Sequence, residues 1–235
     1  MKADEIVSEL KSLGSESIKK ILMNHGAREP FFGVKVEHLK KIQKRIKKNY
    51  ELALELYATG ISDAMYLAGL IADDEKMTKK QLQLWAEEAY WYMLSEYTVP
   101  WVAASGPHGW DMGQKWIGSK KEGVAAAGWS TFSNLVSMKP DEELDIPALT
   151  KLLSQIPKEI HKEANRVRYT MNGFVISLGA YVNPLSEKAV QVAEKIGPVT
   201  VEMGGTSCKV PSAPEYIEKA KARGSLTKKK KTCKC

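Results

Sequence analysis

The segment "SEYTVPWVAASGPHGW", Ser95 to Trp110, holds the residue types with the clearest chemical potential in this sequence. Tyr97, Trp101 and Trp110 surround a stretch rich in proline and glycine, in which a loop or a helix end is expected. An aromatic side chain at such a place can stack on a nucleobase or hold a cation, although most large aromatics pack inside proteins. His108 lies between the two tryptophans and belongs to the same candidate surface.

Cationic side chains stand near several predicted helix starts. A helix N-terminus attracts anions through its partial positive charge and its free N–H groups. The cations concerned are Lys79, Lys80, Lys120, Lys121, Arg166 and Arg168. In stacked helical pairs such starts can form a row along one edge, which suits a phosphate backbone. The alternative is a set of solvated charges balanced by nearby acids. Arg166 and Arg168 are the strongest candidates, because Asn165 and Tyr169 stand beside them.

Composition gives a weaker indication of the same partner. The chain has 235 residues, 43% of them hydrophobic and 27% charged, which is typical of a globular protein. Its 35 Lys and Arg against 28 Asp and Glu give a net charge of +7, which favours a polyanionic partner. We expect a cytoplasmic monomer without a membrane segment, because the apolar runs are short and the first residues are charged at helical intervals.

The sequence does not support a metal site. Three cysteines, Cys208, Cys233 and Cys235, show no C-x-x-C spacing, and the four histidines are scattered. We expect neither a metal nor a cofactor.

Helical periodicity dominates the chain. In "GVKVEHLKKIQKRIKKNY", the apolar residues Val36, Leu39, Ile42 and Ile46 form one stripe and lysines cover the other faces. Three apolar segments centre on Gly69, Gly128 and Gly173, where small side chains would let helices approach closely. We predict an all-α fold, an irregular right-handed α-solenoid of HEAT-like antiparallel helix pairs. A globular helical bundle is the alternative.

The C-terminal part departs from this pattern. In "VTVEMGGTSCKV", a Gly204-Gly205 turn would pair two short strands with Cys208 facing inward, so we predict a small β-hairpin over 199–210 packed on the helices. Residues 1–224 then form a single solenoid domain. Residues 225–235, which include "KKKK", are expected to form a basic, flexible tail.

The sequence resembles the AlkD-like DNA alkylation repair proteins. The resemblance runs from about Phe31 to Tyr181, through "FFGVKVEHLKKIQKRI", "ALELYATGISDAMYLAGLIAD", the aromatic segment and "NRVRYTMNGFVISLGAYV". It implies a HEAT-like solenoid that cradles the DNA backbone on a concave basic surface. It also implies tryptophan faces around a damaged base and one Asp that stabilises the positive charge developing on the sugar.

Two positions differ from the pattern that this resemblance implies. Pro100 or Trp101 stands where the catalytic Asp is expected, and "EGVAAAGW" stands where the family has an Arg. Glu96 and Asp111 are the nearby acids that could substitute, and they are the candidate catalytic residues. The alternative is that Glu96 is a solvated helix residue and Asp111 a capping or surface acid.

The sequence is compatible with three functions. The first is a DNA-binding protein of the alkylation-repair type that holds duplex, damaged or branched DNA through its phosphates. The second is an N-glycosylase that excises cationic purines such as 7-methylguanine or 3-methyladenine. The third is a helical-repeat scaffold for other proteins.

Overall fold

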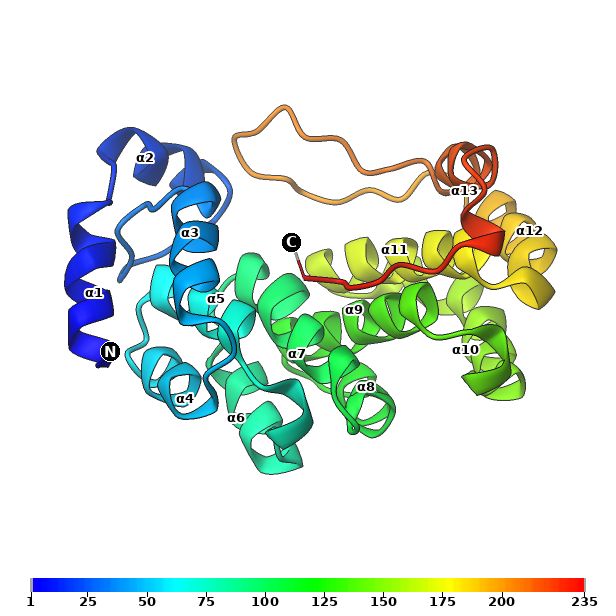
Figure 1. The fold of residues 1–235 in the computed structure, drawn as a ribbon. Coiled ribbons are helices and arrows are strands. Elements are labelled where there is room, and N and C mark those ends of the chain that lie inside the picture. Colours follow the sequence, from blue (N-terminus) through cyan, green and yellow to red (C-terminus); the bar gives the residue numbers. More distant parts are fainter. Residues whose placement is uncertain (1, 235) are drawn as a thin grey trace.

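The computed structural model describes residues 2–234 as an array of stacked α-helices (Figure 1). The helices are α1 (Ala3–Ser12), α2 (Glu16–Asn24), α3 (Val36–Ile46), α4 (Tyr50–Ala58), α5 (Ser62–Ile71), α6 (Lys79–Glu88), α7 (Val99–Ser105), α8 (Gly109–Ile117), α9 (Glu122–Met138), α10 (Ile146–Glu159), α11 (Asn165–Tyr181), α12 (Ser186–Ile196) and α13 (Ala213–Lys221). A π-helical turn, Met93–Thr98, leads into α7. Residues 2–234 contain no β-strand, so the predicted all-α class is confirmed.

The helices form two layers. Helices α4, α6, α8 and α10 lie along the lower side in Figure 1, and α5, α7, α9 and α11 lie above them. Outer and inner helices pack in pairs, α4 on α5 and α8 on α9, and successive inner helices touch, α7 with α9 and α9 with α11. The core lies between the layers. This is the stacking of helical pairs that a solenoid requires.

Small residues set the closest approaches between helices. A Cβ placed on Gly69 would lie 2.5 Å from Cγ2 of Thr98, and one on Gly128 would lie 2.6 Å from the backbone nitrogen of Ile117. The predicted role of these two glycines is therefore confirmed. The prediction for Gly173 is wrong, because no heavy atom lies within 4 Å of a Cβ at that position.

The predicted β-hairpin over 199–210 is wrong. Residues 197–212 form an irregular loop that arches over the inner helices (Figure 1). The side chain of Asn165 takes the place of a strand partner, because its Nδ2 donates to the Glu202 carbonyl at 2.9 Å and its Oδ1 accepts from the Glu202 N–H at 2.7 Å. Cys208 is exposed rather than inward-facing.

The basic tail lies across the ends of the inner helices. It runs from α13 towards α5 and α7 (Figure 1). Nζ of Lys229 donates to the carbonyls of Val136 at 2.9 Å and Tyr181 at 2.6 Å, and to Oδ1 of Asp141 at 2.7 Å. These contacts tie the C-terminal ends of α9 and α11 together, where cations are favoured. The residues expected to be a flexible extension thus make specific contacts with the body.

Replacing Lys229 with methionine is expected to lower the free energy of unfolding by about 2 kcal/mol, since a side chain only 19% exposed loses charge-assisted hydrogen bonds. Urea denaturation measures the change. Lys231→Met is the matched control, because Lys231 is exposed and its loss should change stability by less than about 0.5 kcal/mol. Equal effects of the two substitutions would show that the tail is not held by Lys229.

Candidate nucleic-acid interface

A buried ion pair forms the centre of the candidate site. Arg166, in the first turn of α11, donates from Nε to Oε1 of Glu96 at 2.6 Å and from Nη2 to Oε2 at 2.6 Å, across 70 residues of sequence. The Glu96 side chain is 3% exposed and that of Arg166 is 20% exposed. Two parallel charge-assisted bonds fix the guanidinium in one orientation.

Two aromatic rings contact the guanidinium. Its central carbon lies 4.7 Å from the ring centre of Tyr92 and 4.5 Å from that of Tyr169. Nη1 also contacts Sδ of Met203 in the loop at 3.7 Å. Arg166 is therefore held by cation-π contacts as well as by its carboxylate partner.

The local backbone explains how Glu96 comes to face inward. Glu96 lies in the π-helical turn Met93–Thr98. Pro100 has no N–H with which to bond the carbonyl of Glu96, four residues earlier, and this permits a wider turn. Such single π turns occur often at functional sites. Here the turn buries Glu96 and leaves the next residue, Tyr97, partly exposed.

The ion pair keeps Arg166 protonated and fixed in place. Burial raises the pKa of the Glu96 carboxyl, and the hydrogen bonds and charge of Arg166 oppose that shift. Burial acts to lower the pKa of Arg166, but the bonds and charge of Glu96 outweigh it, so its pKa is raised. Burial also raises the pKa of Tyr92, Tyr97 and Tyr169. The tyrosines thus remain neutral hydroxyl donors beside a permanent cation.

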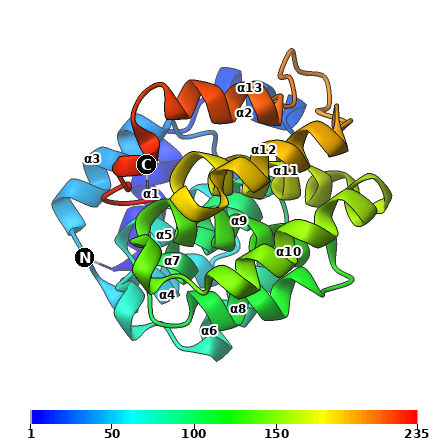
Figure 2. The ribbon, with the colours of Figure 1, turned by 90° about the vertical axis from the view of Figure 1, so that its right-hand side faces the viewer.

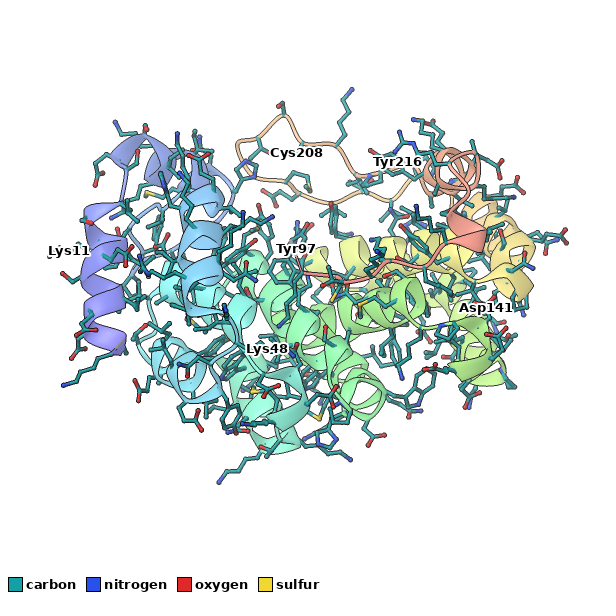
Figure 3. The ribbon with its side chains drawn as sticks, viewed as in Figure 1. Lys11, Lys48, Tyr97, Asp141, Cys208 and Tyr216 are labelled. Carbon is teal, nitrogen blue, oxygen red and sulfur yellow. The ribbon has the colours of Figure 1, made fainter. Side chains whose placement is uncertain are left out.

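Two cavities meet at this cluster. A cavity of about 1090 Å³ lies between the π-helical turn with the residues just before it, the start of α11, the end of α2 and the loop 197–212, and Tyr92, Tyr97, Arg166 and Tyr169 line it. A second, of about 360 Å³, lies between α7, α9 and α11 and is lined by Tyr97, Trp101 and Tyr169 among others. Figure 3 shows Tyr97 beneath the loop that carries Cys208. We call the two cavities together the inner groove.

The structure brings together five of the sequence-predicted site residues. These are Glu96, Tyr97, Trp101, Arg166 and Tyr169. The ring of Tyr97 lies 5.9 Å from that of Trp101, which is 4% exposed and packs on Tyr66 at 5.3 Å. Trp101 therefore forms the floor of the groove rather than a free stacking face. Arg168 lies one turn along α11, where its Nη2 donates to Oδ1 of Asn165 at 3.3 Å.

The other predicted residues lie elsewhere. Nζ of Lys79 and Oδ2 of Asp111 form an exposed ion pair at 2.5 Å, and Lys80 lines a separate hollow beside Lys79 on the outer helix α6. The hydrogen bond from Lys79 lowers the pKa of Asp111. Asp111 and Glu96 are thus not partners in one site.

The remaining aromatics and lysines are also outside the inner groove. The Trp110 ring packs on Phe132 at 5.1 Å and lines a hollow beside α10, and His108 precedes α8. Lys120 and Lys121 are exposed just before α9. The next residue, Glu122, accepts a 2.7 Å hydrogen bond from the backbone N–H of Arg166, so the starts of α9 and α11 lie together.

Sequence reasoning did not single out three groove residues. Tyr92 makes a cation-π contact with the Arg166 guanidinium, Met203 contacts that guanidinium from the loop, and the Arg28 guanidinium donates to the Tyr90 carbonyl at the groove's edge. Tyr92 had a detectable signal, because it belongs to the aromatic run that precedes Tyr97. The positions of Met203 and Arg28 depend on how distant segments fold together.

The fold and the groove define a class of protein: a helical-repeat protein with a cationic and aromatic inner groove. Comparison with known proteins supports this class. The model of the family described as DNA alkylation repair enzyme matches residues 6–216. The chain belongs to this family.

Relatives match over nearly the whole chain. Uncharacterized protein Lin0241 of Listeria innocua is 36% identical, and Lmo0209 of Listeria monocytogenes is 34% identical, each over 94% of this chain and 97% of the relative. A solved structure is similar over 100% of both chains, with 38% identity and a TM-score of 0.91. It is described as one of a new family of proteins related to the HEAT-like repeat DNA glycosylases with affinity for branched DNA structures.

Across residues 2–234, no helix is long and apolar enough to cross a membrane. In the same part of the chain, no group of three or more His, Cys, Asp or Glu side chains is arranged to hold a metal ion.

Proposed function

We propose that this protein binds duplex, damaged or branched DNA through the backbone phosphates, with little or no excision of bases. The observation that carries the proposal is that both carboxylate oxygens of Glu96 are bonded to Arg166. The carboxylate of Glu96 is therefore not free to act on a ligand, and the groove presents tyrosine hydroxyls and the cations Arg28 and Lys209. Guanidinium groups and hydroxyls bind phosphates, and exposed aromatic faces stack on unpaired bases. The affinity for branched DNA described for the structural neighbour supports the same choice.

Base excision is less well supported by this arrangement. A carboxylate that stabilises a developing positive charge on the sugar must face the substrate, whereas Glu96 faces Arg166 and is 3% exposed. Asp111 lies on the outer side beside Lys79. Pro100 and Trp101, where the resemblance places a catalytic Asp, are both buried at the start of α7.

Gel-shift titration tests the binding function. Linear duplex, a four-way junction and methylated duplex are compared at low and high salt. A protein that neutralises about four phosphates loses on the order of 100-fold in affinity between about 50 and 200 mM salt. We expect salt-sensitive binding of this size, tightest for the junction. No salt-sensitive affinity for any of these DNAs would remove the proposal and favour a protein-interaction scaffold.

A base-release assay on methylated DNA separates binding from catalysis. At excess protein we expect no free 7-methylguanine or 3-methyladenine. Release that is lost in Glu96→Gln or Asp111→Asn would establish the glycosylase instead. A cytoplasmic, monomeric protein is part of the proposal.

A further inference from the structure

A second basic surface lies on the opposite edge of the inner layer from the loop 197–212. Figure 2 shows α3 and the C-terminal tail on one side of the molecule and this loop on the other. Side chains from both segments, including Lys44, Lys47, Lys48 and Lys234, line a hollow of about 510 Å³. We call the lysines of α3, the two that follow it and Lys234 of the tail the α3–tail patch.

Most cations of this patch lack a counterion. Four exposed lysines of α3 and its end form no ion pair within residues 2–234: Lys40, Lys41, Lys44 and Lys47. By contrast, Arg45 is paired with Glu9 at 2.5 Å, and Lys48 lies 3.8 Å from Asp73. Close-spaced like charges repel, so an unneutralised cluster of lysines is suited to a bound polyanion.

The tail completes the patch and neutralises the acid nearest to it. Nζ of Lys234 lies 2.7 Å from Oδ1 of Asp74, and the two side chains are 12% and 9% exposed. This buried pair fixes the end of the tail beside α3. Because Asp74 is already paired, it does not cancel the charge of Lys44 and Lys47. Thr232 adds a neutral hydroxyl to the same hollow, and Gln43, which also lines it, donates from Nε2 to the Leu70 carbonyl at 3.2 Å.

Lys47 adopts a backbone conformation that folding alone does not favour. It caps the C-terminal end of α3 with φ 63° and ψ −146°, a region that glycine enters without strain and other residues rarely adopt. Its N–H donates to the Gln43 carbonyl at 2.7 Å, which closes the turn. A glycine would make the same turn at lower energy. The side chain of Lys47 is thus present at a cost in stability, which is expected of a residue that binds a ligand.

We propose that the α3–tail patch is a second phosphate-binding surface, and that it holds a different arm of a branched DNA from the arm at the inner groove. The inference rests on the proposed DNA-binding function. The phosphates of one straight duplex follow a continuous path, whereas a junction sends its arms in different directions. Two cationic surfaces on opposite edges of one rigid layer therefore bind a junction better than a linear duplex, because the second contact is intramolecular.

The test compares Lys44→Glu/Lys47→Glu with the parent on a four-way junction and on a linear duplex of equal arm length. We expect the dissociation constant for the junction to rise about 10-fold or more, the salt slope to fall by about two, and linear-duplex binding to change less than about twofold. Lys151→Glu/Lys158→Glu is the matched control, because it makes the same charge change on exposed positions of the outer helix α10.

A second variant separates binding from folding. Lys47→Gly is expected to raise the thermal unfolding midpoint, because it removes backbone strain, while it weakens junction binding about threefold. An unchanged affinity for the junction in both variants would overturn the inference, as would an equal loss for junction and linear DNA. Failure of the proposed function is seen separately, since the parent protein would then show no salt-sensitive DNA binding.

Discussion

Replacing Arg166 with methionine is expected to lower the free energy of unfolding by about 3–5 kcal/mol, because it leaves the buried carboxylate of Glu96 without a partner. The loss is larger than that of a surface ion pair, since the freed carboxylate of Glu96 is only 3% exposed and poorly hydrated. The cation-π contacts with Tyr92 and Tyr169 disappear in the same step. Chemical denaturation at constant salt measures the change.

The same variant should show a characteristic pH dependence. Burial already raises the pKa of Glu96 in the parent, and loss of Arg166 removes the group that opposes the shift. A raised folded-state pKa gives stability that is present below the unfolded pKa of about 4.3 and is lost as pH rises. The deficit of Arg166→Met relative to the parent is therefore smaller near pH 4 than at neutral pH.

Two controls identify the ion pair as the cause. Glu96→Gln/Arg166→Met removes both charges and should recover a large part of the lost free energy of unfolding, because an unpaired buried charge is what destabilises the fold. Arg166→Lys keeps the charge without the bidentate geometry, so its free energy of unfolding should fall between those of the parent and Arg166→Met. A double variant as unstable as Arg166→Met would mean that the aromatic packing, not the pair, stabilises this region.

Much of the fold could be predicted because it follows from local periodicity. The stripe in α3 is an example: Leu39 and Ile42 are buried at the predicted spacing, although Val36 at its start is exposed. The loop 197–212 could not be predicted in this way. Its Gly204-Gly205 turn and alternating residues favour a hairpin, but Asn165, 37 residues earlier, bonds the Glu202 backbone in place of a second strand. The local sequence around the loop gives no sign of this competing hydrogen-bond partner.

The candidate site was predicted in part for a related reason. Helix starts carrying cations look alike in both layers, so the pattern at Lys79 could not be distinguished from the pattern at Arg166. The structure places Lys79 at the start of the outer helix α6 and Arg166 at the start of the inner helix α11. The partnership of Glu96 with Arg166 spans 70 residues and depends on the packing of the π-helical turn beside α11, which no spacing rule supplies.

Gly128→Ala is expected to lower the free energy of unfolding by about 3 kcal/mol, at the upper end of overpacking effects. The added Cβ would lie 2.6 Å from the Ile117 backbone nitrogen and 3.0 Å from the Gly113 carbonyl oxygen. Because these are backbone atoms of α8, no side-chain rotation relieves the clash, and α8 must move away from α9. Thermal and denaturant unfolding both report the loss.

Gly173→Ala is the matched control, because it makes the same change in the middle of the neighbouring inner helix. No heavy atom lies within 4 Å of the new methyl group, so alanine should stabilise α11 by about 1 kcal/mol through its higher helix propensity. Gly173 also lines the smaller cavity of the inner groove. If DNA enters that cavity, Gly173→Ala weakens binding while it strengthens the fold, and Gly128→Ala weakens the fold without altering the groove's lining. Similar stability losses for the two glycines would contradict the proposed packing of the inner helices.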